Sequence, residues 1–102
     1  MDAQLKKGLL DVCVLKVLEQ GESYGYKIIS DLEQVIPVSE STLYPILKRL
    51  ETSGYVVTTP KEHNGRLRKY FTITQAGRRK IKTFLEDSEE FTRIMRFLTE
   101  EL

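Results

Sequence analysis

The dipeptide Asn64-Gly65 separates two short segments that are rich in β-branched and aromatic residues, residues 55–59 and residues 68–74. Such residues favour β-strands because their side chains fit a pleated, half-buried surface. Asn-Gly is a preferred pair for the two-residue loop of a hairpin, since both positions of that turn need a positive φ. The sequence therefore predicts a β-hairpin in the second half of the chain.

Two helical patterns open the chain. Apolar residues cover most of a helical circumference over residues 4–20, which predicts a central, buried helix that Gly21 ends. Ser23 is the expected N-cap of a second helix. This helix should stop before Pro37, because a proline pushes the preceding residue out of helical geometry.

A third helix is expected over about residues 40–53, with Ser39 or Ser41 as its cap and Gly54 after its end. Its apolar residues follow the i, i+3, i+4, i+7 spacing of one buried stripe. The stripe consists of Leu43, Ile46, Leu47 and Leu50. The opposite face presents Thr42, Tyr44, Pro45, Lys48 and Arg49.

Thr74 is the expected cap of a long final helix over residues 75–101, whose apolar residues run close to the a/d seam of a heptad repeat. The seam contains Ile81, Phe84, Leu85, Ser88, Phe91, Met95, Leu98 and Leu102. Packing on the first helix accounts for the early turns but not for the extension past Glu90. The distal half is therefore predicted to form a dimer interface together with the first helix. The interface residues are expected to be Leu5, Leu9, Phe84, Phe91, Ile94, Met95 and Leu98.

Three helices, a hairpin and a further helix give the order α-α-α-β-β-α, which is typical of a winged helix-turn-helix. The fold class is thus mainly α with a β-hairpin wing. A chain of 102 residues suffices for one domain. We expect residues 1–74 to form the DNA-binding part and residues 75–102 to form the dimerisation helix, as one continuous unit.

Charge is distributed unevenly along the chain, although the formal net charge is only +1. Residues 61–82 carry 8 Lys/Arg and 1 Asp/Glu, whereas residues 1–60 carry 6 and 8, and residues 83–102 carry 2 and 6. The basic block coincides with the hairpin, where Glu62 is the one acidic residue nearby. Such a block is expected to contact phosphate.

Residues that carry catalytic chemistry are few and scattered. His63 is the single histidine and Cys13 the single cysteine, and no metal-ligand spacing or glycine-rich phosphate loop occurs. The apolar surroundings of Cys13 favour a buried, inert thiol. We therefore expect no enzyme activity, no metal and no cofactor. No apolar run suits a membrane span or a secretion signal, so a cytoplasmic protein is expected.

A polar helix face beside a basic hairpin predicts a two-part clamp on double-stranded DNA. The third helix would meet base edges in the major groove, and the hairpin would neutralise phosphates. Tyr24 and Tyr26 either add phosphate hydrogen bonds or pack in the core. The expected DNA-binding residues are Tyr24, Tyr26, Ser41, Thr42, Tyr44, Pro45, Lys48, Arg49, Lys61, His63, Asn64, Gly65, Arg66, Arg68 and Lys69.

Three segments closely resemble the PadR family of transcriptional regulators. They are residues 21–26 (GESYGY), residues 41–51 (STLYPILKRLE) and residues 65–70 (GRLRKY), in the family's order and spacing. A single C-terminal helix resembles the short subfamily. The resemblance implies a dimeric winged-helix repressor that binds a pseudo-palindromic operator and responds to a small phenolic or drug-like effector.

The chain departs from the family's pattern in the last helix. Many members have a tryptophan midway along it, which in multidrug-sensing relatives stacks on flat ligands at the dimer centre. This chain has no tryptophan, and the matching position is Ser88. Phe84 and Phe91 flank that position, so an aromatic effector pocket is expected around Phe84, Ser88 and Phe91.

Two other functions fit the same sequence features. A winged helix can serve as a protein-interaction module, in which the basic hairpin meets an acidic partner. The chain can also act as a ligand sensor that needs a further subunit for contact with DNA. Salt-sensitive binding to duplex DNA in the presence of excess random competitor separates these functions from direct DNA recognition.

Overall fold

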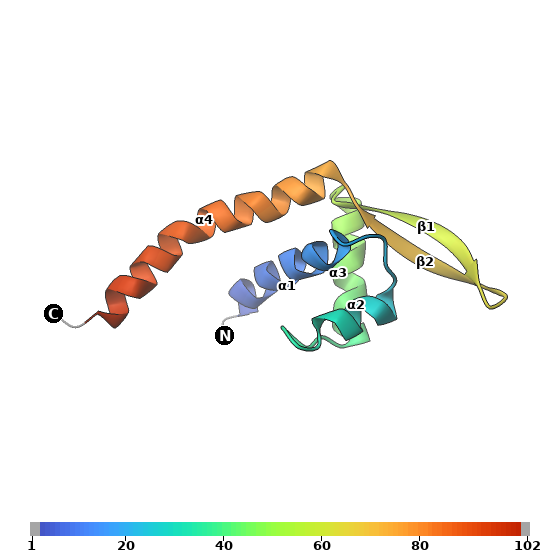
Figure 1. The fold of residues 1–102 in the computed structure, drawn as a ribbon, viewed down its shortest axis with the longest axis horizontal. Helices are drawn as coiled ribbons and strands as arrows, with labels where there is room; N and C mark the ends of the chain where they lie inside the picture. Colours follow the sequence, from blue (N-terminus) through green and yellow to red (C-terminus); the bar gives the residue numbers. More distant parts are fainter. Residues whose placement is uncertain (1–2, 101–102) are drawn as a thin grey trace.

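The computed structural model describes residues 3–100 and confirms the order α-α-α-β-β-α (Figure 1). The elements are α1 (Ala3–Leu18), α2 (Gly25–Leu32), α3 (Glu40–Thr52), β1 (Val56–His63), β2 (Arg66–Ile73) and α4 (Gln75–Thr99). The predicted end of the last helix at residue 101 and the seam position Leu102 lie outside the described residues. Between residues 3 and 100, no helix is long and apolar enough to cross a membrane.

The predicted hairpin turn is confirmed, and the strands are longer than expected. Asn64 and Gly65 both have positive φ, at 52° and 79°, as a two-residue loop of this type requires. The antiparallel ladder runs from Val56 paired with Ile73 to His63 paired with Arg66. Residues 60–63 have little strand preference of their own. They are held in the ladder because the turn fixes the register of every pair behind it.

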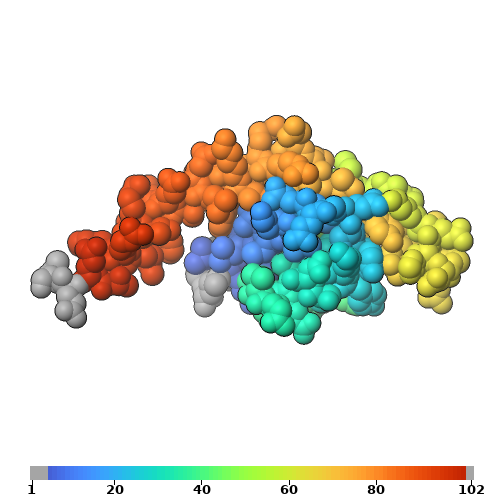
Figure 2. All heavy atoms as spheres, viewed as in Figure 1, coloured from blue at the N-terminus to red at the C-terminus, as the bar shows by residue number. Residues whose placement is uncertain are grey.

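The core lies where the three helices meet the base of the hairpin. Leu15 of α1, Ile28 of α2 and Leu47 of α3 are completely or almost completely buried, as is Val56 at the start of β1. The first turns of α4 cover this core through the partly buried Ile81. The distal half of α4 stands clear of the domain (Figure 2), in a molecule that measures 64 × 25 × 21 Å.

Thr74 caps α4 as predicted, and it also fastens this helix to the end of α3. Its hydroxyl oxygen accepts a hydrogen bond from the Gly77 amide at 3.1 Å and donates one to the Gly54 carbonyl at 2.7 Å. Gly54 follows the C-cap of α3 with a φ of 80°, which confirms its predicted place. A single side chain therefore links the end of α3 to the start of α4.

The prediction that Ser23 caps α2 is wrong. Tyr24 is the N-cap residue, and it makes no side-chain capping bond. Ser23 is buried, and its backbone exchanges two hydrogen bonds with Phe71 of β2, at 3.0 and 2.7 Å. The loop before α2 is thus tied to the hairpin by a bridge between residues far apart in the sequence.

Candidate nucleic-acid interface

The predicted division of α3 into a buried stripe and a polar face is confirmed. The four apolar stripe residues are at most 5% exposed. Ser41, Thr42, Tyr44, Pro45 and Lys48 are exposed. Ser39 occupies the N-cap position, and its hydroxyl bonds with the hydroxyls of Ser41 at 3.0 Å and Thr42 at 3.2 Å rather than capping a backbone amide. The first turn of α3 therefore presents a cluster of hydroxyl groups.

Arg49 occupies a different position from the other predicted contacts on α3. Its guanidinium forms an ion pair with Asp11 of α1, whose side chain is only 16% exposed. The Arg49 side chain remains 36% exposed at the edge of the polar face. This pair holds α3 against α1, so much of the charge of Arg49 is neutralised within the domain.

The basic residues of the wing, the β1–β2 hairpin, are ordered by neighbouring aromatic rings. The Arg68 guanidinium lies 3.9 Å from the centroid of the Tyr24 ring, a cation–π contact. Tyr24 packs edge-on against Tyr70, which lies on β2 like Arg68, and the two ring centroids are 5.5 Å apart. Tyr24 therefore packs against the wing.

Glu62 is not the only acidic residue near the wing. Lys61 forms an ion pair with Glu22, which precedes α2. The two residues lie 39 positions apart in the sequence, so local charge patterning did not indicate the pair. His63, Asn64, Gly65 and Arg66 are exposed at the turn, as predicted.

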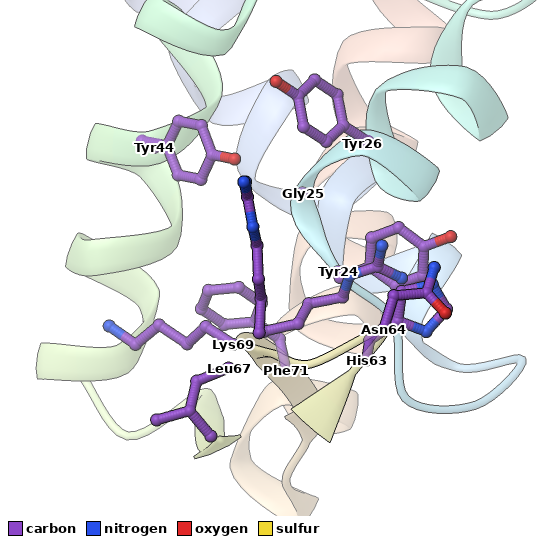
Figure 3. A pocket seen from close by; sticks show the side chains of 11 residues that line it. Tyr24, Gly25, Tyr26, Tyr44, His63, Asn64, Leu67, Lys69 and Phe71 are labelled. Atoms are coloured by element: carbon purple, nitrogen blue, oxygen red, sulfur yellow. The ribbon is translucent and has the colours of Figure 1, made fainter. Parts of the chain in front are cut away.

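A groove of about 380 Å³ lies between the wing and the start of α2 and α3, and we call it the wing-side groove (Figure 3). The helices contribute Tyr24, Gly25, Tyr26 and Tyr44. The wing contributes His63, Asn64, Arg66, Leu67, Arg68, Lys69 and Phe71. The groove brings together predicted residues of both halves of the clamp, so the hairpin and α3 present one continuous surface. Lys48 lies farther along α3, beside Lys69.

Gly25 is a residue of this surface that the sequence interpretation missed. A Cβ atom at this position would lie 2.5 Å from Tyr44 Oη and 3.0 Å from Tyr44 Cζ. The phenol of Tyr44 is therefore placed over α2 only because Gly25 has no side chain. The flanking tyrosines Tyr24 and Tyr26 were the one available signal, since a glycine in an aromatic segment is typical of a close approach.

Exposed aliphatic and acidic side chains also belong to this surface. Leu67 of the wing is 79% exposed, although its neighbours in the strand are basic. Glu40 begins α3, and a hydrogen bond to its carboxylate together with its negative charge raises the pKa of the exposed Tyr26 phenol. Away from this surface, Cys13 is only partly buried rather than fully buried as expected, and this partial burial raises the pKa of its thiol.

The predicted interface residues of α4 divide into two groups. Phe84 is partly buried and lies against α1 near Gly8, where a Cβ atom would contact its ring at 3.8 Å. Phe91, Ile94, Met95 and Leu98 are between 45% and 66% exposed. Leu5 of α1 is 42% exposed, and Leu9 is partly buried. The distal face of α4 is thus an apolar stripe that other described residues leave largely uncovered.

Comparison with known proteins identifies the family. The model of the transcriptional regulator PadR-like family matches residues 14–83. A transcriptional regulator from Clostridium thermocellum is 27% identical, with a TM-score of 0.86 over 96% of this chain and 100% of that chain. A PadR-like transcriptional regulator from Bacillus cereus strain ATCC 14579 is 31% identical, with a TM-score of 0.81 over 97% and 100% of the two chains.

A third similar structure is Bacillus subtilis PadR in complex with operator DNA, which is 27% identical with a TM-score of 0.71. The similarity covers 76% of this chain and 46% of that one. The family model covers well over half of the sequence, and its fold agrees with the winged helix described above. The chain therefore belongs to the PadR-like family, whose members are transcriptional regulators and not enzymes.

Proposed function

We propose that this protein is a sequence-specific DNA-binding repressor that acts as a homodimer. The observation that carries the proposal is the continuous surface formed by the polar face of α3 and the basic wing around the wing-side groove. Hydroxyl, phenol and ammonium groups on α3 suit the donor and acceptor pattern of the major groove. The cations of the wing suit the phosphate backbone beside it.

The two parts of the surface would contribute differently to binding. Arg66 and Lys69 are exposed beside α3, where they can neutralise phosphates without reading sequence. Thr42 and Tyr44 project from the recognition helix and would contact base edges. The similarity to Bacillus subtilis PadR, crystallised with operator DNA, supports this use of the fold.

Homodimerisation through α4 is the second part of the proposal. The exposed apolar stripe of α4 suits burial against a second copy, with Leu5 and Leu9 of the partner's α1 nearby. Two recognition helices related by a two-fold axis would then contact two half-sites about one helical turn apart. A pseudo-palindromic operator follows from that symmetry.

Selection of binding sites from a pool of random duplexes tests the function. The expected result is an enriched, two-fold symmetric site, bound in the presence of excess random competitor and weakened by added salt. A variant with Thr42→Ala and Tyr44→Phe should lose the enrichment while keeping non-specific affinity. A folded protein that enriches no site but binds an acidic peptide would instead support the protein-interaction alternative.

A further inference from the structure

A second groove lies between α3 and the first turns of α1, on the opposite flank of the polar face from the wing. Its volume is about 400 Å³, similar to the 380 Å³ of the wing-side groove. Its lining includes Lys6, Lys7, Ser41, Thr42, Pro45 and Arg49. The exposed face of α3 is thus a ridge between two grooves. Tyr44 lines the wing-side groove, and Thr42 lines this second groove, which we call the α1-side groove.

Two lysines of α1 supply the charge of the α1-side groove. Lys6 and Lys7 are exposed, and neither forms an ion pair with any side chain described between residues 5 and 100. Arg49 differs, because Asp11 neutralises much of its charge. Lys16, at the other end of α1, also has a partner, Glu19, at 3.0 Å. The uncompensated positive charge of α1 is therefore concentrated at the groove.

The position of this groove relative to the wing points to its occupant. A helix in the major groove of B-DNA, which is about 12 Å wide, has a phosphate backbone on each side. The cations of the wing are placed to hold one backbone. The other backbone must pass the opposite flank of α3, where Lys6 and Lys7 of α1 face Ser41 and Thr42 of α3 across the α1-side groove.

We propose that Lys6 and Lys7, with the hydroxyl of Ser41, bind phosphates of the DNA strand opposite the wing. Ammonium groups provide affinity that is independent of sequence, and hydroxyls donate hydrogen bonds to phosphate oxygens. This inference rests on the proposed function and adds a third anchoring element to it. The family model begins at residue 14, so it does not include the two lysines.

The proposal gives α1 a role in DNA binding in addition to its contribution to the core. Leu10 lines the same groove and is 6% exposed, so the helix turn that carries the lysines is fixed by packing. The Arg49–Asp11 pair fixes the neighbouring part of α3 against α1. Binding would therefore order only the two lysine side chains, and both walls of the groove are already in place.

The test compares a Lys6→Gln, Lys7→Gln double variant with wild-type protein on the duplex that the wild type selects. The logarithm of affinity is measured against the logarithm of salt concentration, between roughly 50 and 200 mM. Each lost phosphate contact should reduce the slope by about 0.9, so the double variant should lose roughly twice that amount. Hydroxyl-radical footprinting should lose protection on one strand at the flank away from the wing, while protection at the wing side remains.

Lys16→Gln is the matched control, since it removes one charge from the same helix outside the groove. It should leave the slope and the footprint unchanged. A double variant that is folded and keeps the wild-type slope overturns the inference without affecting the proposed function. An equal loss per charge in the control also overturns it, because the effect would then be one of net charge. Wild-type protein that binds no duplex DNA overturns both proposals.

Discussion

Gly25 is the residue whose lack of a side chain makes room for the Tyr44 phenol on the proposed DNA-binding surface. The Tyr44 hydroxyl occupies the space where a Cβ atom of residue 25 would be, only 2.5 Å away. The ring can move, because the clash is with the far end of a side chain rather than with backbone. Gly25 is therefore a positioning residue for Tyr44, and its effect can be separated from the stability of the fold.

We predict that Gly25→Ala displaces Tyr44 and lowers affinity for the selected duplex by about tenfold, the lower part of the range for losing one base contact. Affinity for random duplex should change much less. Thermal unfolding should be nearly unchanged, since alanine is the better helix former at the start of α2. Tyr44→Phe, which keeps the ring and removes the hydroxyl, shows how much of the effect comes from the phenol. Equal losses on both duplexes would contradict the positioning role.

Arg66 offers a second prediction for a single residue. It is exposed next to the hairpin turn and pairs with His63 across the ladder. Arg66→Ala should weaken binding to selected and random duplexes equally and reduce the salt slope by about 0.9. Arg68→Ala is a useful comparison, because it also removes the stacking contact with Tyr24 and should disturb the wing itself. A change of sequence preference in Arg66→Ala would contradict a role restricted to phosphate.

Among single residues, the sequence predicted those structural roles that depend only on residues nearby in the sequence. The cap at Thr74 and the positive φ at Asn64 are local features, and both are confirmed. The bridge at Ser23 and the Arg49–Asp11 pair join residues that are 48 and 38 positions apart. No local pattern encodes such contacts, because they depend on how the helices cross.

At the level of elements, the junction between α3 and α4 fastens the three-helix part of the domain to the long helix. Thr74 makes both of its hydrogen bonds there, one to each side of the junction. A Cβ atom at Gly77 would lie only 2.4 Å from the Tyr55 carbonyl oxygen, so there is no room for a side chain at this position. The start of α4 is thus built against the loop that follows α3. In the proposed dimer, α4 would therefore be firmly joined to the surface proposed to bind DNA.

Thr74→Ala should destabilise the domain by about 1–2 kcal/mol, because it removes the N-cap bond and leaves the Gly54 carbonyl without this donor. The measurement is denaturant unfolding followed by circular dichroism. Thr74→Ser keeps the hydroxyl and should recover most of the stability. If the serine variant were as unstable as the alanine variant, packing of the methyl group rather than capping would be the source of the effect.

Some features of the elements could be predicted from the sequence, and others could not. The order and approximate bounds of the helices followed from apolar periodicity and caps, because those signals lie within each element. The hairpin extends to residues 60–63 because the turn fixes its register, although those residues have low strand preference. The α1-side groove was not predicted, since its walls come from two helices that are far apart in the sequence, with Leu10 of α1 and Ile46 of α3 both in its lining.

At the scale of the whole molecule, α4 would set the distance between the two DNA-binding surfaces of the proposed dimer. The domain core ends near Ile81, and the helix continues to Thr99 with an exposed apolar stripe. Among residues 3–100, no further element covers that stripe. The sequence predicted a second copy on this stripe but not the position of the two-fold axis that such a dimer would have, because that position depends on the shapes of both surfaces.

Ser88 should mark a cavity at the centre of such a dimer. Ser88 is partly buried, and it lies between Phe84 and Phe91 in the sequence. Its hydroxyl donates a hydrogen bond to the Leu85 carbonyl at 2.8 Å. We predict that the wild-type dimer binds an apolar dye such as anilinonaphthalene sulfonate and that Ser88→Trp reduces the dye fluorescence by filling the cavity. DNA affinity without dye should be unchanged, with Ser88→Ala as the control. Unaltered dye binding in the tryptophan variant would contradict an effector pocket at this position.

Leu98→Asp tests the dimer, on which high DNA affinity should depend. Leu98 is 66% exposed in the single chain and lies in the distal stripe of α4. A carboxylate buried there without a partner would cost several kcal/mol, so the interface should open. Sedimentation should give a monomer. A monomer contacts one half-site only and loses the high effective concentration of the second contact, so affinity for the selected duplex should fall to that for random duplex.

Thr92→Asp, which adds the same charge to α4 outside the predicted stripe, should stay dimeric. A Leu98→Asp protein that remained dimeric and bound the selected duplex normally would rule out the α4 interface and, with it, the pocket at Ser88.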